Sequence, residues 1–407
     1  MIYRYIQKQI EEQITHFPII LLTGPRQTGK STCLYHHFAG DRYAYVSLDD
    51  SLELALAKSD PRSFLQLHPY PLIIDEVQKA PMLFPEIEAI VNCSRPERGN
   101  RESNGMFILS GSQRSILLDQ AKESLSGRVC ILDMNNLSVN EIYGLENNGC
   151  FHADLMECSS RSKRYTLSET EAFQRIVRGF FPVLYDDPGI ASSSFYSSYF
   201  STYMQKDLKE ILSVSDEVRF VNFIRLLASN TGEELIYENY SKQIGASANT
   251  IRSWVSALVR TGIIYLVQPY NEESFFKRTV KLPKMYFFDT GLAAYLCGID
   301  NAETLQRSFL KGRFFETFVY NEIRKSFTNE GIMQPLYYYR DSDQNEVDLV
   351  LIKDGTLSCI EIKSGQNFNV SDTKGFKKLS NTKYNLAKNA IICTADKVST
   401  LMTAHFC

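Results

Sequence analysis

The sequence has no apolar run long enough to cross a membrane. Its longest runs, FPIILL and YPLIID, fall far short of the ~20 residues that a membrane helix requires. The first 17 residues are charged and amphipathic and lack the apolar core of a signal peptide. The nine cysteines contain no Cys-x-x-Cys pair, and an odd count without paired spacing is typical of reduced thiols. We therefore expect a cytoplasmic protein without a membrane contact, a disulfide or a structural zinc.

The chain also lacks an excess of basic charge, because its net charge is −3 and its pI is about 6.1. Non-specific affinity for nucleic acid comes mostly from phosphate neutralisation, so this balance excludes a protein that coats DNA indiscriminately. Local DNA contacts stay open, since basic residues cluster at two places. They are Arg252, Arg260, Lys277, Arg278, Lys281 and Lys284, and then Lys374, Lys377, Lys378 and Lys383, which read equally well as a solvated face.

The order of apolar segments predicts the fold of the first third. A chain of 407 residues with 44% hydrophobic residues is expected to hold two or three domains. Near-continuous apolar strands that alternate with helix-length stretches predict an α/β domain over 1–145, with a parallel sheet covered on both faces. The strands are expected at 19–24, 43–48, 71–76, 106–111 and 128–133, with a helix at 1–17, a polar loop at 95–105 and a linker at 145–169.

One motif in this domain predicts a nucleotide site. The stretch GPRQTGKS satisfies G-x-x-x-x-G-K-[ST] and lies between an apolar strand and a helix, as a phosphate loop requires. Its glycines let backbone N–H groups surround the phosphates, Lys30 reaches the outer phosphates, and Ser31 can hold Mg²⁺. The expected nucleotide contacts are Gly24, Pro25, Arg26, Gln27, Thr28, Gly29, Lys30, Ser31 and Thr32.

The segment PLIIDE predicts the acidic partner of this loop. Asp75 ends a buried strand, where a carboxylate is costly unless it serves a metal, so we expect Asp75 and Ser31 to hold Mg²⁺. Glu76 follows directly and is placed to orient or deprotonate the attacking water. The strand at 43–48 lies between the two motifs in sequence, which suits ATPases with an extra strand and favours ATP over GTP.

Two further positions are candidates for contact with the γ-phosphate. Ser112 and Gln113 follow a strand and suit a phosphate sensor, although many strands end in serine for no such purpose. Arg128 suits an arginine finger, a group worth ~10³–10⁵ in rate where it operates. The alternative for Arg128 is a surface contact or a pairing with the linker.

Several segments together carry a family resemblance. They are GPRQTGKST, LIIDEVQKAP, ILSGSQ, ESLSGRV, GFFPVLY, TYMQKDL, KLPKMYFFDTGLAAYL and FFETFVYNEI. In these the chain resembles a prokaryotic family that joins an AAA-type ATPase domain to a conserved C-terminal domain of unknown function. The resemblance implies ATP binding by residues 24–32 together with Asp75 and Glu76. Lys206 stands where we expect an arginine in TYMQKDL, so a γ-phosphate contact from that segment is in doubt.

The middle of the chain, 169–300, is predicted to be helical and to contain a winged helix at about 233–284. The order helix, tight turn, helix, strand at 238–269 supports this, with 248–261 as the recognition helix. Its outward face would carry Asn249, Arg252, Ser253 and Ser256, side chains able to contact DNA. The alternative is a lid that packs on the ATPase domain and touches no DNA.

A hairpin in the last region, 301–407, predicts a second site. Asp354-Gly355 is a strong two-residue turn signal, and its register places Asp348 opposite Glu361 and puts Lys363 on the same face. Two facing carboxylates destabilise a hairpin, and a bound Mg²⁺ or Mn²⁺ would remove that conflict. Lys363 could then position water or steady a phosphate.

Glu316 lies on a predicted helix upstream of this hairpin and can supply a further carboxylate. The order Glu316, Asp348, Glu361, Lys363 resembles the PD-(D/E)xK restriction-endonuclease-like fold and implies a metal-dependent nuclease. An inactive, regulatory domain of the same fold is the alternative. We therefore expect an ATPase that controls a nucleic-acid-directed C-terminal domain, or a nucleotide-switched scaffold that binds protein or DNA without cleavage. A protein partner or a homo-oligomer also stays open.

Overall fold

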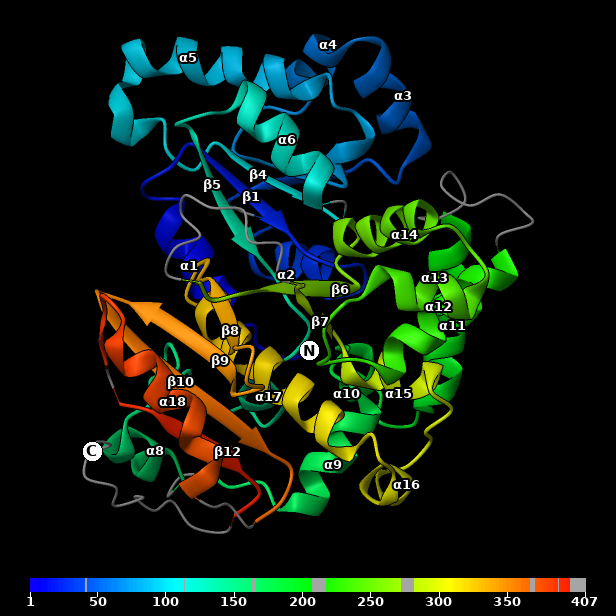
Figure 1. Cartoon of the computed structure of the whole chain (residues 1–407). Coiled ribbons are helices and arrows are strands. Elements are labelled where there is room, and N and C mark those ends of the chain that lie inside the picture. The colour runs from blue at the N-terminus through cyan, green and yellow to red at the C-terminus, as the bar shows by residue number, and fades with distance from the viewer. Residues whose placement is uncertain are drawn as a thin grey trace.

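The computed structural model describes residues 1–40, 42–112, 114–162, 165–206, 217–271, 282–366, 370–386 and 388–395. These residues form two sheets with separate helices around them (Figure 1). None of their helices is both long and apolar enough to cross a membrane.

The first sheet is the parallel sheet expected from the apolar runs. Its five strands lie in the order β2-β3-β4-β1-β5, and every pairing in it is parallel. All five expected strands are confirmed. Their bounds are β1 Ile19–Thr23, β2 Ala44–Ser47, β3 Leu72–Asp75, β4 Phe107–Gly111 and β5 Val129–Asp133.

Helices cover both faces of this sheet, as buried parallel strands require. Figure 1 shows α3, α4, α5 and α6 at the top of the molecule, with α1 and α2 on the other side of the strands. Two apolar clusters fill the two interfaces, one containing Phe64, Leu83 and Leu117, the other Ile10 and Leu34. The helices are α1 Ile6–Gln13, α2 Lys30–His37, α3 Ser51–Ser59, α4 Pro61–Leu67, α5 Leu83–Glu102 and α6 Arg114–Ser124.

Two expectations for this region are wrong. The polar stretch 95–105 is not a loop, because α5 continues through it to Glu102. A polar helix end has no apolar stripe, so polarity alone does not separate it from a loop. The stretch 145–169 is more than a linker: it contains α8 Leu155–Ser162, and the N–H of Phe151 donates to Ser326 Oγ at 2.9 Å.

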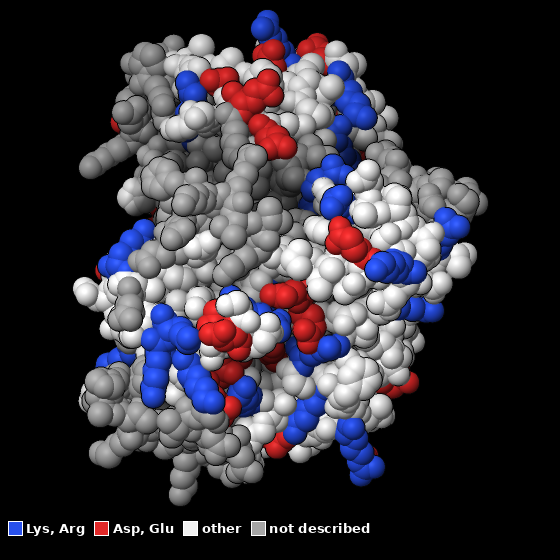
Figure 2. Space-filling view, in the orientation of Figure 1, with Lys and Arg blue, Asp and Glu red and all other residues white. Residues whose placement is uncertain are grey.

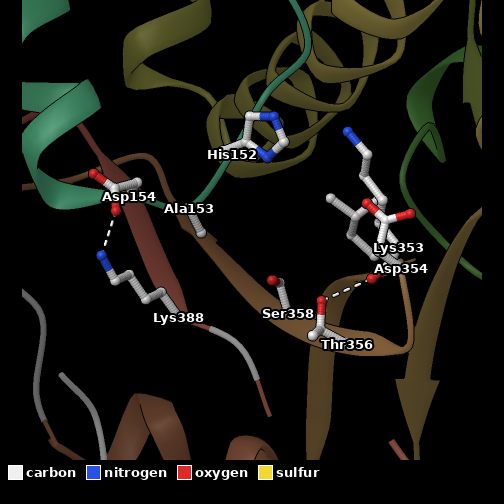
Figure 3. Close-up of a pocket in the computed structure, with 9 residues that line it drawn as sticks. His152, Ala153, Asp154, Lys353, Asp354, Thr356, Ser358 and Lys388 are labelled. Atoms are coloured by element: carbon white, nitrogen blue, oxygen red, sulfur yellow. Dashed lines mark hydrogen bonds and ion pairs between the residues drawn. The ribbon is translucent and has the colours of Figure 1, made fainter. Parts of the chain in front are cut away.

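Figure 3 shows where this stretch runs. His152, Ala153 and Asp154 lie against a hairpin that forms some two hundred residues further along the chain. Asp154 also pairs with Lys388. Together they border a small polar pocket of about 210 Å³. The stretch therefore packs across the surface of the C-terminal region. Polar contacts hold it there, and such contacts need no apolar periodicity in the sequence.

The second sheet is mixed and is built from both the middle and the end of the chain. Its order is β11-β10-β9-β8-β6-β7, and β12 also pairs with β10. Strand β6 pairs with β8 in parallel through Gln268–Tyr337 and Pro269–Tyr338, so sheet and core are continuous across the expected boundary at 300 and 301. The strands are β6 Ile264–Pro269, β7 Lys284–Phe287, β8 Leu336–Arg340, β9 Glu346–Lys353, β10 Thr356–Lys363, β11 Asn385–Leu386 and β12 Ala390–Cys393.

The helices of this part pack on the second sheet or on each other around one large apolar core, except that Phe376 of α18 belongs to a smaller cluster with Val350 and Leu357. The expected order helix, turn, helix, strand is present in α13, α14 and β6, with Gly245 at the turn in the left-handed region (φ +70°). The helices are α7 Val139–Ile142, α9 Glu169–Arg178, α10 Val183–Asp186, α11 Ser192–Lys206, α12 Glu217–Ser229, α13 Tyr237–Ile244, α14 Ala248–Arg260, α15 Thr290–Leu296, α16 Ala302–Arg307, α17 Lys311–Thr328 and α18 Lys374–Lys378.

Charged side chains of both signs are scattered over the visible face (Figure 2). Basic side chains gather at its lower left, over α18, with acidic ones beside them. Lys374, Lys377 and Lys378 of α18 are exposed, and Lys378 lies 3.6 Å from Asp343. The first expected basic cluster is described only in part, because 272–281 lies outside the described residues.

Candidate functional site

The phosphate loop leaves the carboxyl end of β1 and enters α2. Gly24 has φ +149° and Gly29 has φ +93°, both in the left-handed region that favours glycine. A Cβ on Gly24 would lie 2.1 Å from the carbonyl oxygen of Met134, which follows β5. Glycine is therefore required at the first position of the motif both by backbone conformation and by the close approach of a neighbouring strand.

Lys30 is buried at the start of α2 and points back into the loop. Its Nζ donates to the carbonyl oxygens of Gly24 at 2.9 Å and Pro25 at 2.7 Å. Burial lowers the pKa of Lys30 to about 8, and the carboxylates of Glu76 and Asp75 oppose part of that shift. The ammonium is thus held inside the loop by weak acceptors that a phosphate can replace.

Arg4 braces the loop from outside, and the motif gave no sign of it. Its Nη1 donates to the Thr28 carbonyl at 2.6 Å and its Nη2 to the Asn135 carbonyl at 2.7 Å. Its Nε pairs with the buried carboxylate of Glu141 at 3.0 Å. The only signal in the sequence was a basic residue just before the first helix, which carries no specific meaning.

Asp75 and Glu76 lie at the carboxyl end of β3, beside the loop. Asp75 is buried; Tyr45 Oη donates to its Oδ2 at 2.9 Å, and Ser110 Oγ donates to its Oδ1. Burial, and then the charge of Asp75, raise the pKa of Tyr45. A carboxylate fixed by two hydroxyls is a hard oxygen ligand, so Asp75 together with Ser31 fits Mg²⁺.

Glu76 adopts φ +58°, an uncommon conformation for a residue other than glycine. Its Oε2 accepts hydrogen bonds from Gln78 Nε2 and from Ser112 Oγ, the latter at 3.4 Å. Ser112 reaches it because β4 lies between β1 and β3 in the sheet. The structure therefore brings Ser112, Glu76 and the loop to one edge, while Gln113 lies outside the described residues.

Arg128 is not at this edge, and its expected place in the nucleotide site of its own chain is wrong. It directly precedes β5, whose first residue pairs with Ile19, so it lies at the opposite end of the sheet from Gly24. Its guanidinium contacts Asn92 at 2.7 Å and Glu88 at 3.1 Å. The side chain of Lys206 lies outside the described residues.

A cavity of about 420 Å³ lies above the loop, between the first sheet and the rest of the chain. Gly24, Pro25 and Ser112 line one side, and Gly262 and Tyr265 line the other. A Cβ on Gly262 would lie 3.0 Å from Pro25 Cγ, so the turn after α14 packs directly on the phosphate loop. The nucleotide site is thus bounded by two separate parts of the chain.

The hairpin expected near the C-terminus is confirmed with its register. Leu357 pairs with Ile352, and the ladder runs to Ile360–Leu349, so Asp348 and Glu361 are the next residues on it. The turn residue Asp354 has φ +50°, as a two-residue hairpin turn requires.

A lysine that the sequence reasoning had assigned to a basic patch occupies the centre of this second site. Lys284 Nζ of β7 is buried and lies 2.9 Å from Glu316 Oε1, 2.7 Å from Glu346 Oε1 and 3.6 Å from Asp348 Oδ1. Lys363 Nζ donates to Glu361 Oε1 at 2.7 Å. The conflict between facing carboxylates, expected to be relieved by a metal, is relieved here by two lysines.

Burial sets the protonation of this cluster. It raises the pKa of Glu316 to about 7 and of Asp348 to about 6, although Lys284 opposes both shifts. Burial alone would lower the pKa of Lys284, but Glu316 and its neighbours raise it well above its usual range. The cluster is therefore a buried ion network with its own internal cation.

A resident divalent metal does not fit this donor set. Within the described ranges no group of three or more acidic, histidine or cysteine side chains could hold a metal ion. Glu361 Oε2 is buried and has no hydrogen-bond partner in the part of the chain that the structure describes, but one oxygen beside Lys363 does not make a coordination sphere. The structure brings Glu316, Asp348, Glu361 and Lys363 to one region, but with Lys284 among them.

Comparisons with known protein families agree with a phosphate-binding loop in the first part of the chain. An AAA domain family matches residues 16–143, and two domains of unknown function, DUF8612 and DUF4143, match 169–303 and 311–406. The uncharacterized proteins Mb2031c of Mycobacterium bovis and Rv2008c of Mycobacterium tuberculosis are each 27% identical over 348 residues, 85% of this chain and 70% of theirs.

Among solved structures, the Walker-type ATPase paby2304 of Pyrococcus abyssi aligns over 72% of this chain and 94% of its own, at 14% identity and a TM-score of 0.43. That score is too low to carry weight by itself. The family match, the parallel sheet and the loop geometry agree without it. Residues 16–143 match the AAA domain family, and the glycine-rich loop and parallel sheet within them have the arrangement of a P-loop domain.

Proposed function

We propose that the protein binds ATP on the loop 24–32 and hydrolyses it with Asp75 and Glu76. The observation that carries the proposal is the meeting of Lys30, Glu76 and Ser112 at the carboxyl edge of one parallel sheet. Backbone N–H groups of a glycine-rich turn and a helix N-terminus favour a phosphate at this edge. Lys30 exchanges its carbonyl acceptors for phosphate oxygens and so gains charge-assisted hydrogen bonds.

The hydrolytic step assigns a role to each of these groups. A water oxygen bonds to the γ-phosphorus while the bond from that phosphorus to the β,γ-bridging oxygen breaks. Glu76 accepts the proton of the water and later releases it to solvent, which leaves ADP and inorganic phosphate. Ser112 Oγ donates a hydrogen bond to Glu76 Oε2 and so holds that carboxylate in place. Ser31 and Asp75 would hold Mg²⁺, which neutralises phosphate charge when bound.

Two substitutions test this proposal. Lys30→Ala should abolish ATP binding in a titration, because it removes the buried cation of the loop. Glu76→Gln should bind ATP as tightly as the parent and lose about 10²-fold or more in hydrolysis, since only the proton acceptor is removed. Tight binding by Lys30→Ala would overturn the loop assignment. Full activity of Glu76→Gln would overturn the role of Glu76.

The predicted winged-helix module is better supported as a lid on this site than as a DNA reader. The turn after α14 packs against Pro25 through Gly262. Arg252, the expected DNA contact, pairs with Glu238 at 3.5 Å and lies over the ring of Tyr237. Arg252→Ala should therefore leave DNA affinity and its salt dependence unchanged. A fall of about one unit in salt slope would restore the DNA-binding role.

For the C-terminal module, a nucleotide-controlled binding or regulatory role has more support than a metal-dependent nuclease. The resemblance of Glu316, Asp348, Glu361 and Lys363 to the PD-(D/E)xK order favours the nuclease. The position of Lys284 between these carboxylates favours the other role, because its ammonium already balances their charge.

The full chain decides between these roles. With Mg²⁺ or Mn²⁺ in the absence of nucleotide, we expect no gain in melting temperature that depends on Asp348 or Glu361. We also expect no cleavage of single-stranded or duplex DNA or RNA, with or without ATP. Metal-dependent cleavage that disappears in Glu361→Gln would establish the nuclease instead.

A further inference from the structure

Arg324 of α17 reaches out of the second half of the chain to the edge of the first sheet. Its Nη2 pairs with Oδ2 of Asp133, the last residue of β5, at 2.7 Å. Its Nη1 donates to the amide oxygen of Asn135, and its guanidinium lies 3.9 Å above the ring of Tyr265. The side chain is only 12% exposed, so three separate elements hold it in place.

This position adjoins the phosphate loop. Asp133 is the register partner of Thr23, the last residue of β1, and Gly24 of the loop follows directly. Arg324 also lines the cavity of about 420 Å³ that Gly24, Pro25 and Ser112 line. Among the described residues around that cavity, Arg324 has the one cationic side chain.

We propose that Arg324 contacts the terminal phosphate of ATP bound in the same chain. The inference rests on the proposed ATPase function and adds a catalytic residue to it. Asp133 anchors one end of the guanidinium, and the other end rests on a neutral amide oxygen. A charged phosphate oxygen is a stronger acceptor than that amide, so Nη1 can move to it while Nη2 stays on Asp133.

Two other arginines near the first sheet are placed less well for this role. Arg128 lies at the far end of β5. Arg4 is committed to the buried carboxylate of Glu141 and to two backbone carbonyls, one of them within the loop itself. Arg324 combines a place in the cavity with an acceptor that a phosphate can displace.

The first test is Arg324→Gln in the full chain, compared with Arg313→Gln on the same helix. Arg313 pairs with Glu233 at 2.8 Å and serves as a control for the loss of an α17 ion pair. We expect Arg324→Gln to bind ATPγS at least tenfold more weakly, to keep its ADP affinity within about twofold, and to lose about 10³ in kcat. Arg313→Gln should keep the parent ratio of ATPγS to ADP affinity.

A purely structural role for the pair would give a different result. Arg324→Gln removes the cation of the ion pair with the buried Asp133, so the double variant Asp133→Asn/Arg324→Gln, which replaces the ion pair by two amides, is measured beside it. If either folded variant has the same ratio of ATPγS affinity to ADP affinity and the same kcat as the parent, the proposal is overturned. If the parent binds neither nucleotide, the proposed function fails instead.

A structure of the unaltered protein with AMP-PNP and Mg²⁺ provides a measurement that needs no variant. The proposal expects Arg324 Nη1 within hydrogen-bond distance of a γ-phosphate oxygen. A guanidinium that still donates to Asn135, with the γ-phosphate out of its reach, would overturn it.

Discussion

At the scale of single residues, the buried ammonium of Lys30 links nucleotide binding to pH. The pKa of Lys30 is lowered to about 8 in the unliganded protein, and burial is the main cause. The negative phosphates of bound ATP raise that pKa again, because an opposite charge favours the charged form. We therefore expect ATP binding above pH 8 to take up protons.

The first prediction follows from this linkage. The affinity for ATP should be about tenfold weaker at pH 9 than at pH 7, since only about a tenth of the unliganded protein keeps Lys30 charged at pH 9. Calorimetric titrations in buffers of different ionisation enthalpy should show proton uptake. Equal affinity at both pH values, without proton uptake, would contradict it.

The stability of the unliganded protein should change in the opposite direction. Because the folded-state pKa of Lys30 lies below its unfolded value, the unfolded chain holds more protons between about pH 8 and pH 10.5. The contribution of Lys30 to the free energy of unfolding therefore rises with pH in that window. Lys30→Ala is the control, and chemical denaturation of it should show no such contribution.

The motifs predicted some of the site residues and missed others for a physical reason. Lys30 and Asp75 were found because their chemistry depends on fixed spacing along one segment. Arg4, Lys284 and Arg324 act on partners from other segments. Arg324, for example, meets an aspartate 191 positions earlier. No local pattern records such a meeting, so Lys284 looked like one member of a surface patch.

At the scale of elements, α18 is held on the second sheet by a close approach. A Cβ on Gly375 would lie 2.3 Å from the backbone oxygen of Glu346 and 2.7 Å from a methyl group of Val347. Glycine therefore lets the basic helix α18 lie directly on β9, next to the strand end that contacts Lys284.

The second prediction concerns this contact. Gly375→Ala should lower the free energy of unfolding by about 1–3 kcal/mol, because the clash is with backbone that cannot yield easily. Denaturant unfolding measures it. The control is Gly365→Ala, where no atom of the described residues lies within 4 Å of the added Cβ, and its effect should be close to zero. Equal effects in the two variants would show that α18 shifts without cost.

The elements differ in how far the sequence determined them. The strands of the first sheet were predicted because each is almost wholly apolar, and the hairpin because Asp354-Gly355 fixes its turn. Among the described residues, the pairing of β6 with β8 comprises two residue pairs. So short a parallel contact between distant segments depends on the packing of the whole chain, and its sequence carries no signal for it.

At the scale of the whole molecule, the apolar clusters divide the described chain into two parts. The first sheet has its own two apolar clusters. A large cluster extends from Val139 to Ile362 and joins the predicted winged-helix module to the C-terminal module, and a smaller one that contains Val350 and Phe376 lies mostly within the C-terminal module. The regions matched by the two domains of unknown function therefore share the large core and one sheet.

The third prediction is that a fragment of residues 301–407 will not fold alone. It would lack β6, which pairs with β8, and Lys284, which balances the buried carboxylates of Glu316 and Asp348. Leaving buried carboxylates without their cation costs about 3–5 kcal/mol, a large part of the stability of a small domain.

A fragment of residues 165–407 is the matched control for this experiment. It retains β6, β7 and Lys284, and circular dichroism should show cooperative thermal unfolding for it but not for 301–407. Cooperative unfolding of the shorter fragment would mean that the last module is an independent domain.

The contacts of Arg4 affect when, during translation, the phosphate loop gains its support. It is made before the loop, but it bonds to Asn135 and Glu141, which are added 131 and 137 residues later. Chains emerge from the ribosome at roughly 5–20 residues per second, so the brace on the loop cannot close until many seconds after translation of the loop itself. Arg324 is added later still. A nascent chain therefore has the motif long before residue 324 is added, and a chain released before that point keeps the motif without its support.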